Sequence, residues 1–166
     1  MSKEKKIGII GYGYLGSSLN ALLADTNIEV VRIYNRSEEK LKGLSETIST
    51  TQMEVFMEAA ANLDLVIELA HPDVTKEWGE NILQLTDYMP CSVGALADEK
   101  LKNNLLLTGN ESGKRLLVPH GAVVGIDNIY EARENWEEVT ITFRKPPGAI
   151  ELEEEPEGEE TILFEG

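Results

Sequence analysis

Apolar and polar positions change their spacing regularly along most of the chain, and the changes predict strands and helices in turn. Residues 6–10 form a short apolar run next to glycine, which is typical of a buried strand. From Leu15 onward, apolar side chains recur at helical spacing and predict a helix. Residues 29–34 are β-branched and apolar, so they predict a second strand. Ser37 follows this strand and can cap another helix, with two glutamates in its first turn.

The same alternation continues through the middle of the chain. The further predicted elements are a weak strand near Ile48, a helix through Phe56 and Met57, strands over 64–70, 89–93 and 115–118, a helix opened by Pro72 and a helix over 98–107. Strands that alternate with helices of this length form βαβ units. The pattern therefore predicts an α/β fold with a doubly wound parallel sheet that helices cover on both faces.

The pattern changes in the last quarter of the chain. Residues 126–135 predict one helix, and residues 139–144 alternate and are rich in threonine, which predicts a half-exposed antiparallel strand. A last apolar stretch covers residues 161–164. Two such strands joined by an acidic loop cannot build a core of their own. We therefore predict one domain over 1–121 and, over 122–166, the first elements of an incomplete α+β domain.

Composition narrows the classes of partner. The chain has 166 residues and a formal net charge of −15, which argues against nucleic acid and anionic membranes. Eight glutamates and no lysine or arginine lie within residues 151–166, as in a solvated loop or tail. No apolar run approaches the roughly 20 residues of a membrane span, and the N-terminus lacks a signal-peptide pattern. Because the chain has one cysteine, it cannot form an intrachain disulfide, and we expect a cytoplasmic protein. This cysteine, Cys91, is expected in the middle of a core strand.

Three glycines after the first predicted strand point to a bound dinucleotide. Gly11, Gly13 and Gly16 form the pattern G-x-G-x-x-G between a strand and a helix. In that context the first glycine permits a tight turn, the second lets a pyrophosphate approach the backbone, and the third lets helix and strand pack closely. The free N–H groups of the helix N-terminus favour phosphate. We therefore predict a Rossmann-type fold whose residues 1–121 bind NAD or NADP.

The end of the second strand distinguishes the two cofactors. Enzymes that use NAD usually carry an acidic residue there, which accepts hydrogen bonds from the ribose hydroxyls. This chain has Asn35, Arg36 and Ser37 instead. A guanidinium attracts a 2′-phosphate, and Ser37 can add a donor. We therefore predict that NADP is preferred over NAD, whereas the alternative is that Arg36 is an ordinary surface arginine.

The ends of the later strands are the expected place for the rest of the ligands, because open α/β sheets bind there. Two of these ends are predicted to contact the nicotinamide half, namely Ala70-His71-Pro72 and Val93-Gly94-Ala95, and a third is His120-Gly121-Ala122. His120 and Gly121 are candidates to lie near substrate, but for His120 a loop position near the cofactor amide is the favoured interpretation. His71 is expected to cap a helix or to line the nicotinamide pocket. No histidine, cysteine or acidic cluster has the spacing of a metal site, so no metal is expected.

Several longer stretches, taken together, resemble one family. They are GYGYLGSSL (11–19), YNRS (34–37), DLVIELAHP (64–72), SVGALAD (92–98), VPHGAVVGID (118–127), RKPPGAI (144–150) and ILFEG (162–166). In their order and spacing these stretches resemble the L-aspartate dehydrogenase family, including its animal-type relatives. The glycine motif alone would be much less specific.

The resemblance implies a reaction and a set of cofactor contacts. It implies oxidation of L-aspartate to iminoaspartate, which hydrolyses to oxaloacetate and ammonia, or the reverse amination with NAD(P)H. By position it assigns cofactor contacts to Tyr14, Leu15, Asn35, Arg36, Ala70, His71, Pro72 and, beside the nicotinamide, Ala122. It also implies a homo-oligomer for a full-length protein.

The resemblance places the reactive histidine of the family beyond the position of Gly166, so no catalytic residue is assigned within this chain. On that basis the sequence is expected to be a fragment, or one product of a split gene. Two other functions stay open. The chain could bind NAD(P) without turnover, alone or as a subunit of a heteromer, or belong to a homoserine dehydrogenase-like oxidoreductase. Nothing in the residues themselves identifies aspartate physically.

Overall fold

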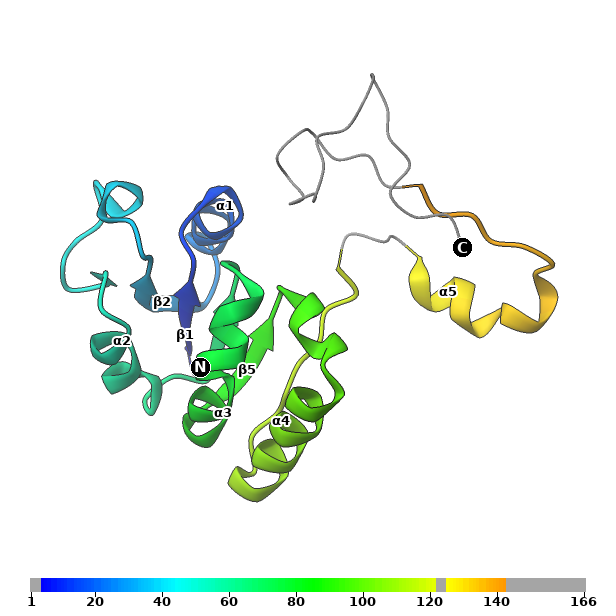
Figure 1. Cartoon of the computed structure of the whole chain (residues 1–166). Helices are drawn as coiled ribbons and strands as arrows, with labels where there is room; N and C mark the ends of the chain where they lie inside the picture. The colour runs from blue at the N-terminus through cyan, green and yellow to red at the C-terminus, as the bar shows by residue number, and fades with distance from the viewer. Residues whose placement is uncertain (1–3, 122–124, 143–166) are drawn as a thin grey trace, which may run out of the picture. The chain divides into compact units, whose positions relative to one another are not determined.

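Five parallel strands form one sheet in the order β3-β2-β1-β4-β5 (Figure 1). The computed structural model describes residues 4–121 and 125–142. The strands are β1 (Lys5–Ile10), β2 (Ile28–Tyr34), β3 (Ser49–Thr50), β4 (Leu65–Glu68) and β5 (Asp87–Pro90). The chain leaves β1 toward β2 on one side and returns from β3 to β4 on the other. This reversal confirms the predicted doubly wound topology and places its switch point between β1 and β4.

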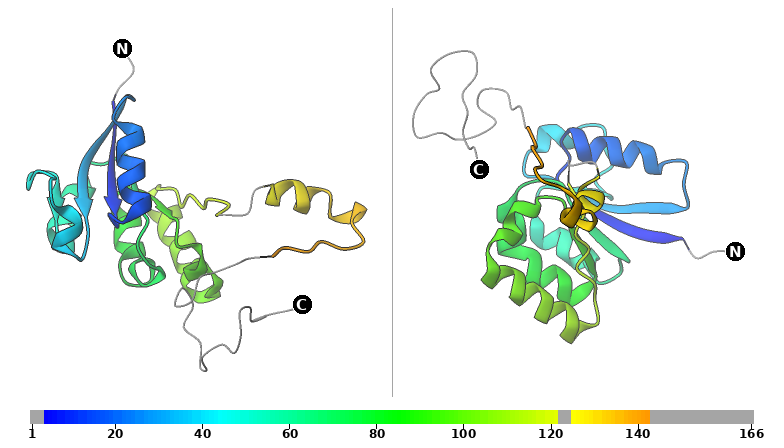
Figure 2. Two further views of the ribbon diagram at one scale, coloured as in Figure 1. Left: turned by 90° about the horizontal axis from the view of Figure 1, so that it is seen from above. Right: turned by 90° about the vertical axis from the view of Figure 1, so that its right-hand side faces the viewer.

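Helices cover the two faces of the sheet unequally. Helix α1 (Tyr14–Leu23) covers one face, whereas α2 (Met53–Ala60), α3 (Pro72–Leu85) and α4 (Glu99–Ser112) gather on the other, with α4 packed against α3 (Figures 1 and 2). Two apolar clusters correspond to these faces. Ile7, Ile9 and Ile33 belong to the cluster under α1, and the larger cluster joins Phe56, Val66, Tyr88 and other residues of α2, α3 and α4.

The strands end level with one another. The last paired row of the sheet runs Thr50, Tyr34, Ile10, Glu68, Pro90. Since all five strands run in the same direction, every segment that follows them leaves the sheet at this one edge. The sheet thereby collects four segments that are far apart in sequence, namely 11–16, 35–37, 69–72 and 91–95.

Two predicted strands differ from the observed ones. Strand β5 begins and ends earlier than expected, at Asp87 and Pro90, and residue 93 already belongs to the 3₁₀ helix η2 (Val93–Ala97). The predicted strand over 115–118 is reduced to a single parallel bridge between Leu116 and Tyr88. Pro90 is the last residue of β5 and Pro119 follows Val118, and neither proline has the N–H group that a longer ladder needs.

The segment after residue 124 forms a separate unit, since the chain divides into Met1–Val124 and Gly125–Gly166. The predicted helix over 126–135 is α5 (Ile126–Glu131) followed by the 3₁₀ turn η3 (Arg133–Asn135). Residues 139–142 are not paired as a strand within the described ranges, and a strand needs a partner. The rest of that predicted strand and the stretch 161–164 lie outside the described residues. The boundary after residue 121 and the α+β character of the second domain stay predictions.

An ion pair at the opposite edge of the sheet gives a pH-dependent prediction. Asp87 accepts hydrogen bonds from the backbone N–H of Arg115 at 2.8 Å and from its guanidinium at 2.7 and 2.9 Å. Burial raises the pKa of Asp87, but the hydrogen bonds from Arg115 outweigh it, and the pKa lies below its ordinary value. A lowered pKa stabilises the fold above the unfolded-state value of about 4 and ceases to do so as the pH falls through the folded-state value.

We therefore expect wild type to exceed Asp87→Asn in free energy of unfolding at neutral pH, and the difference to shrink below about pH 4. Urea unfolding at a series of pH values measures both proteins. Arg115→Gln removes the partner of Asp87 instead. The difference in free energy of unfolding between wild type and Arg115→Gln is expected to shrink in acid in the same way. A difference that grows on acidification would contradict this account.

Candidate functional site: a dinucleotide cradle at the carboxyl edge of the sheet

The glycine turn after β1 is held by two close approaches. Gly11 has φ of 96°, a region that side chains rarely adopt, and a Cβ there would lie 2.8 Å from the backbone of Leu69 and Ala70. A Cβ on Gly16 would collide with the carbonyl oxygen of Gly11. Only glycine fits these two positions, so the turn stays tight and α1 packs directly on it.

Gly13 has a different environment. It is exposed, it precedes the first residue of α1, and a Cβ there would meet no atom of the described residues within 4 Å. No side chain of residues 4–121 or 125–142 caps this helix end, so its first N–H groups point outward without a side-chain partner. Bare backbone, free donors and the positive end of the helix dipole fit a pyrophosphate. This cradle, which a Cβ would fill, is the observation that favours a bound dinucleotide.

Asn35 ties the glycine turn to the end of β2. Its Oδ1 accepts a hydrogen bond from the backbone N–H of Tyr12 at 2.9 Å, and its Nδ2 donates to the carbonyl of Ser37 at 3.0 Å. The hydroxyl of Tyr12 in turn accepts a hydrogen bond from Asn20 of α1 at 3.0 Å. Both ends of the Asn35 amide are thus engaged by backbone groups. The structure gives this residue a supporting role, which the sequence did not suggest.

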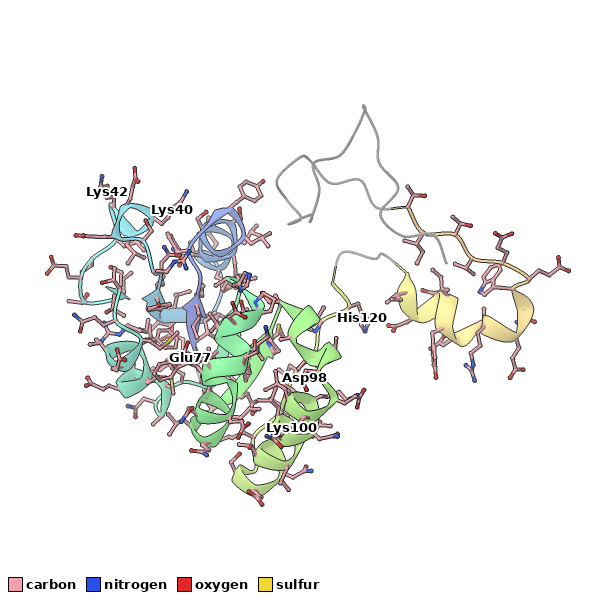
Figure 3. The ribbon with its side chains drawn as sticks, viewed as in Figure 1. Lys40, Lys42, Glu77, Asp98, Lys100 and His120 are labelled. Carbon is pink, nitrogen blue, oxygen red and sulfur yellow. The ribbon has the colours of Figure 1, made fainter. Side chains whose placement is uncertain are left out.

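Arg36 lies just beyond this clamp and is exposed. Its guanidinium forms no hydrogen bond or ion pair with other residues of the described ranges. The 3₁₀ helix η1 (Glu38–Leu41) follows, and Figure 3 shows Lys40 and Lys42 projecting from this turn. Ser37 occupies the capping position of η1, but its side chain makes no capping hydrogen bond, so that prediction is wrong. The hydroxyl of Ser37 therefore stays available to a ligand.

The segment after β4 lies against the glycine turn. Leu69 donates its N–H to the carbonyl of Ile10 at 2.7 Å, at the switch point of the sheet. His71 is the N-cap of α3, where its Nδ1 accepts a hydrogen bond from the N–H of Asp73 at 3.3 Å, and Pro72 opens the helix. The predicted capping role of His71 is confirmed. Ala70 and His71 are exposed, so they can contact a ligand at this edge.

The segment after β5 lies next to the segment after β4. Val93, Gly94 and Ala95 form the 3₁₀ helix η2 rather than a strand end, with Gly94 exposed and Ala95 buried. Cys91 follows β5 and is half-buried, so its predicted position in the middle of a strand is wrong. Burial and the charge of Glu68 raise the pKa of the Cys91 thiol. A thiol held in this form is a poor nucleophile, in agreement with an inert role.

Glu68 joins these two segments, and sequence reasoning missed it. It is the last residue of β4, and it is fully buried although it carries a carboxylate. Its neighbours in the run LVIEL are all apolar. Its carboxylate accepts hydrogen bonds from the N–H of Ala70 at 2.6 Å, the N–H of Ser92 at 3.1 Å and the hydroxyl of Ser92 at 2.9 Å. The signal that could have found it is a carboxylate at the end of a strand that is otherwise apolar.

The third predicted strand end is placed by the bridge between Leu116 and Tyr88. The two segments run parallel there, and Pro90 ends β5, so residues 119–121 lie beyond the carboxyl edge. His120 and Gly121 are exposed, and Figure 3 shows the His120 side chain at the end of this segment. Ala122, the predicted nicotinamide contact, lies outside the described residues.

The edge thus brings together the glycine turn, Arg36 and the segments that contain residues 70–72 and 93–95. Two hollows in the described part of the chain lie elsewhere. One is an apolar hollow of about 470 Å³ in the second unit, lined by Ile126, Tyr130, Trp136 and their neighbours, and the other lies between α3 and α4. Neither holds a residue predicted to bind cofactor, so we place the site by its chemistry. Within the described ranges, no group of three acidic, histidine or cysteine side chains could hold a metal, and no helix reaches the length and apolar character of a membrane span.

Comparisons with known proteins agree with this geometry. Residues 11–119 match the family model described as homoserine dehydrogenase, NAD binding domain. The chain is 32% identical to an aspartate dehydrogenase domain-containing protein of Xenopus tropicalis, over 100% of this chain and 63% of that protein. It is 34% identical to an L-aspartate dehydrogenase of Methanosarcina mazei, over 97% and 65%. The crystal structure of an aspartate dehydrogenase from Thermotoga maritima superposes with a TM-score of 0.62 at 26% identity, over 78% of this chain and 52% of that one.

These matches confirm the predicted resemblance and the Rossmann-type parallel sheet. The chain spans about two thirds of the length of the curated relatives. The family model covers the glycine turn, the end of β2 and the segments after β4 and β5, which are the four parts of the candidate site. The chain therefore belongs to the family described as homoserine dehydrogenase, NAD binding domain, and it is similar in sequence to L-aspartate dehydrogenases.

Proposed function

We propose that this chain carries the cofactor site of an L-aspartate dehydrogenase that prefers NADP over NAD. In this reaction L-aspartate loses a hydride from its α-carbon and a proton from its nitrogen and becomes iminoaspartate. Water then releases ammonia and leaves oxaloacetate, and the reverse direction aminates oxaloacetate. The nicotinamide, when bound, supplies the hydride acceptor or donor.

The bare backbone at Gly13 carries this proposal. The free N–H groups that begin α1 hold the pyrophosphate, and Gly11 and Gly16 keep the turn tight enough for it to approach. The substrate is supported by the curated relatives named L-aspartate dehydrogenase, since no described side chain selects aspartate by itself.

The preference for NADP is supported by Arg36. Its exposed guanidinium has no partner among the described residues and follows directly on the clamp at Asn35, beside the adenosine ribose in this arrangement. Asn35 and Ser37 complete the proposed contacts on this side, and Tyr14 and Leu15, both exposed at the start of α1, lie over the phosphates.

The nicotinamide half is proposed to lie on the other side of β1. Its contacts are Ala70, His71, Pro72, Val93, Gly94 and Ala95, together with Ala122. His120 and Gly121 approach the substrate. No residue of this chain is assigned a chemical step. The whole protein is proposed to be a cytoplasmic homo-oligomer.

Replacing Gly13 with valine tests the cradle. Its φ of −82° is open to other residues and a Cβ meets nothing, so Gly13→Val is expected to fold with a loss of about 1 kcal/mol, mainly from the poorer N-cap. The added side chain fills the space of the pyrophosphate, and we expect NADPH binding, followed by nicotinamide fluorescence, to weaken at least about 100-fold, the equivalent of roughly 2.8 kcal/mol.

Ala24→Val is the matched control, because it puts the same side chain at the other end of α1. It is expected to bind NADPH as wild type does. Equal binding by Gly13→Val and wild type would refute the cradle.

Turnover is tested separately, by following reduced nicotinamide absorbance with L-aspartate and NADP. Turnover by this chain would support the proposed activity directly and show that residues on the chain suffice. NADPH binding without turnover would favour the second candidate, a module that binds cofactor without reacting. Turnover of homoserine but not of aspartate would instead favour a homoserine dehydrogenase-like enzyme.

A further inference from the structure

The buried carboxylate of Glu68 has a more specific purpose than filling the core. We propose that Glu68 is a positioning residue that fixes the segments after β4 and β5 in the arrangement that receives the nicotinamide half of the cofactor. This inference rests on the proposed function and deepens it, because it names the residue that sets one half of the same site.

The first step is the position of Glu68 in the sheet. It is the last residue of β4 and pairs with Ile10 on one side and Pro90 on the other. The glycine turn therefore starts from the neighbouring strand at the same level. The end of β2, which carries Arg36, lies on the far side of β1. A ligand that extends from Arg36 across the glycine turn reaches the segments that Glu68 holds.

The second step is the set of groups that Glu68 contacts. Oε1 accepts from the N–H of Ala70 at 2.6 Å and from the hydroxyl of Ser92 at 2.9 Å, and Oε2 accepts from the N–H of Ser92 at 3.1 Å. Its own carbonyl accepts from the N–H of Cys91 at 2.8 Å. One side chain thus fixes the backbone of the two segments that follow the neighbouring strands β4 and β5. Ala70 begins one proposed contact segment, and Ser92 precedes the other.

The third step is the need for a carboxylate. Two backbone N–H groups point at different oxygens of Glu68, and backbone donors cannot turn away as a hydroxyl can. A glutamine has one oxygen, so in either orientation its NH₂ group faces one of these N–H groups. Glu68→Gln keeps the size of the side chain but leaves one segment without its acceptor.

The sheet offers a matched bridge at its opposite edge. Thr86, also fully buried, precedes β5 and donates its hydroxyl to the carbonyl of Leu63, which precedes β4, at 2.8 Å. Thr86 joins the same two strands as Glu68 but at the amino edge, far from the proposed ligand. Thr86→Val therefore tests whether loss of any buried bridge between these strands has the same effect.

The experiment compares two ligands on the full 166-residue chain. NADPH occupies both halves of the proposed site, whereas adenosine 2′,5′-bisphosphate occupies only the half beside Arg36. We expect Glu68→Gln to weaken NADPH about tenfold, which corresponds to the loss of one buried acceptor, and to leave the bisphosphate unchanged within about twofold. Thr86→Val is expected to lower the thermal midpoint but to leave both affinities unchanged.

Ser92→Ala keeps the test decisive if Glu68→Gln does not fold. It removes one hydrogen bond to Glu68 from a half-buried position, and we expect about threefold weaker NADPH binding with unchanged bisphosphate binding. Equal weakening of both ligands, or no change in either variant that folds, would overturn the positioning role. Wild type that binds neither ligand would instead overturn the proposed function, and the inference with it.

Discussion

Arg36→Asp is expected to reverse the preference between the two cofactors. Among the described residues the guanidinium has no partner, and it lies just after the Asn35 clamp, where it can form two hydrogen bonds to a 2′-phosphate. An aspartate there repels the phosphate and accepts hydrogen bonds from the ribose hydroxyls of NAD. We expect NADPH to bind about 100-fold more weakly and NADH about as well as or better than before, from a charge-assisted contact of roughly 1.5–3 kcal/mol plus the new repulsion.

The measurement is a titration of both reduced cofactors by nicotinamide fluorescence. Lys100→Asp makes the same change of charge in the first turn of α4 and controls for the general effect of added negative charge. It is expected to leave the ratio of the two affinities unchanged. If Arg36→Asp also leaves that ratio unchanged, Arg36 is a surface arginine and the preference for NADP is wrong.

Gly11→Ala is expected to have the largest effect on stability. Gly11 has φ of 96°, and a methyl group there would lie 2.8 Å from the backbone of Leu69 and Ala70. The strained backbone costs about 1–3 kcal/mol, and the clash adds to it because backbone on both sides must move. We expect a loss of at least about 3 kcal/mol in the free energy of unfolding and no detectable NADPH binding.

Gly113→Ala separates these two causes. Gly113 follows α4 as its C-cap with φ of 66°, and a Cβ there meets no atom of the part of the chain that the structure describes within 4 Å. It therefore carries the backbone cost alone, about 1 kcal/mol. Urea unfolding of both variants measures the difference. Equal losses of unfolding free energy in the two variants would show that the close approach of the glycine turn to the segment after β4 does not add to the cost of the Gly11→Ala substitution.

The sequence predicted most of the sheet because its strands are apolar runs bounded by glycine, proline or charged residues. The runs before Gly11 and Pro72 are unambiguous, and both lead into the expected helices. The errors lie where pairing depends on distant partners. Residues 115–118 are as apolar as a strand, but only Leu116 finds a bridge, since Pro119 follows at once.

The sequence predicts the position of the site but not the residues that hold its segments in place. Glycines reveal a turn because the backbone conformation and close approaches there exclude other residues, and a strand end can be predicted from the apolar run before it. The roles of Asn35 and Glu68 depend on backbone donors that other strands bring near them. Such partners are set by strand order, which no local pattern specifies. Thus the sequence predicts Asn35 as a ligand contact alone and does not indicate the role of Glu68.

The central place of β1 also constrains the order in which the chain can fold. Strand β1 ends at Ile10 and pairs first with β2, but its other edge is filled only by β4, whose last residue is Glu68. On a growing chain, residues 1–68 must therefore emerge before the middle strand is covered on both sides. Until then, one edge of the most buried strand is open to pairing with another molecule.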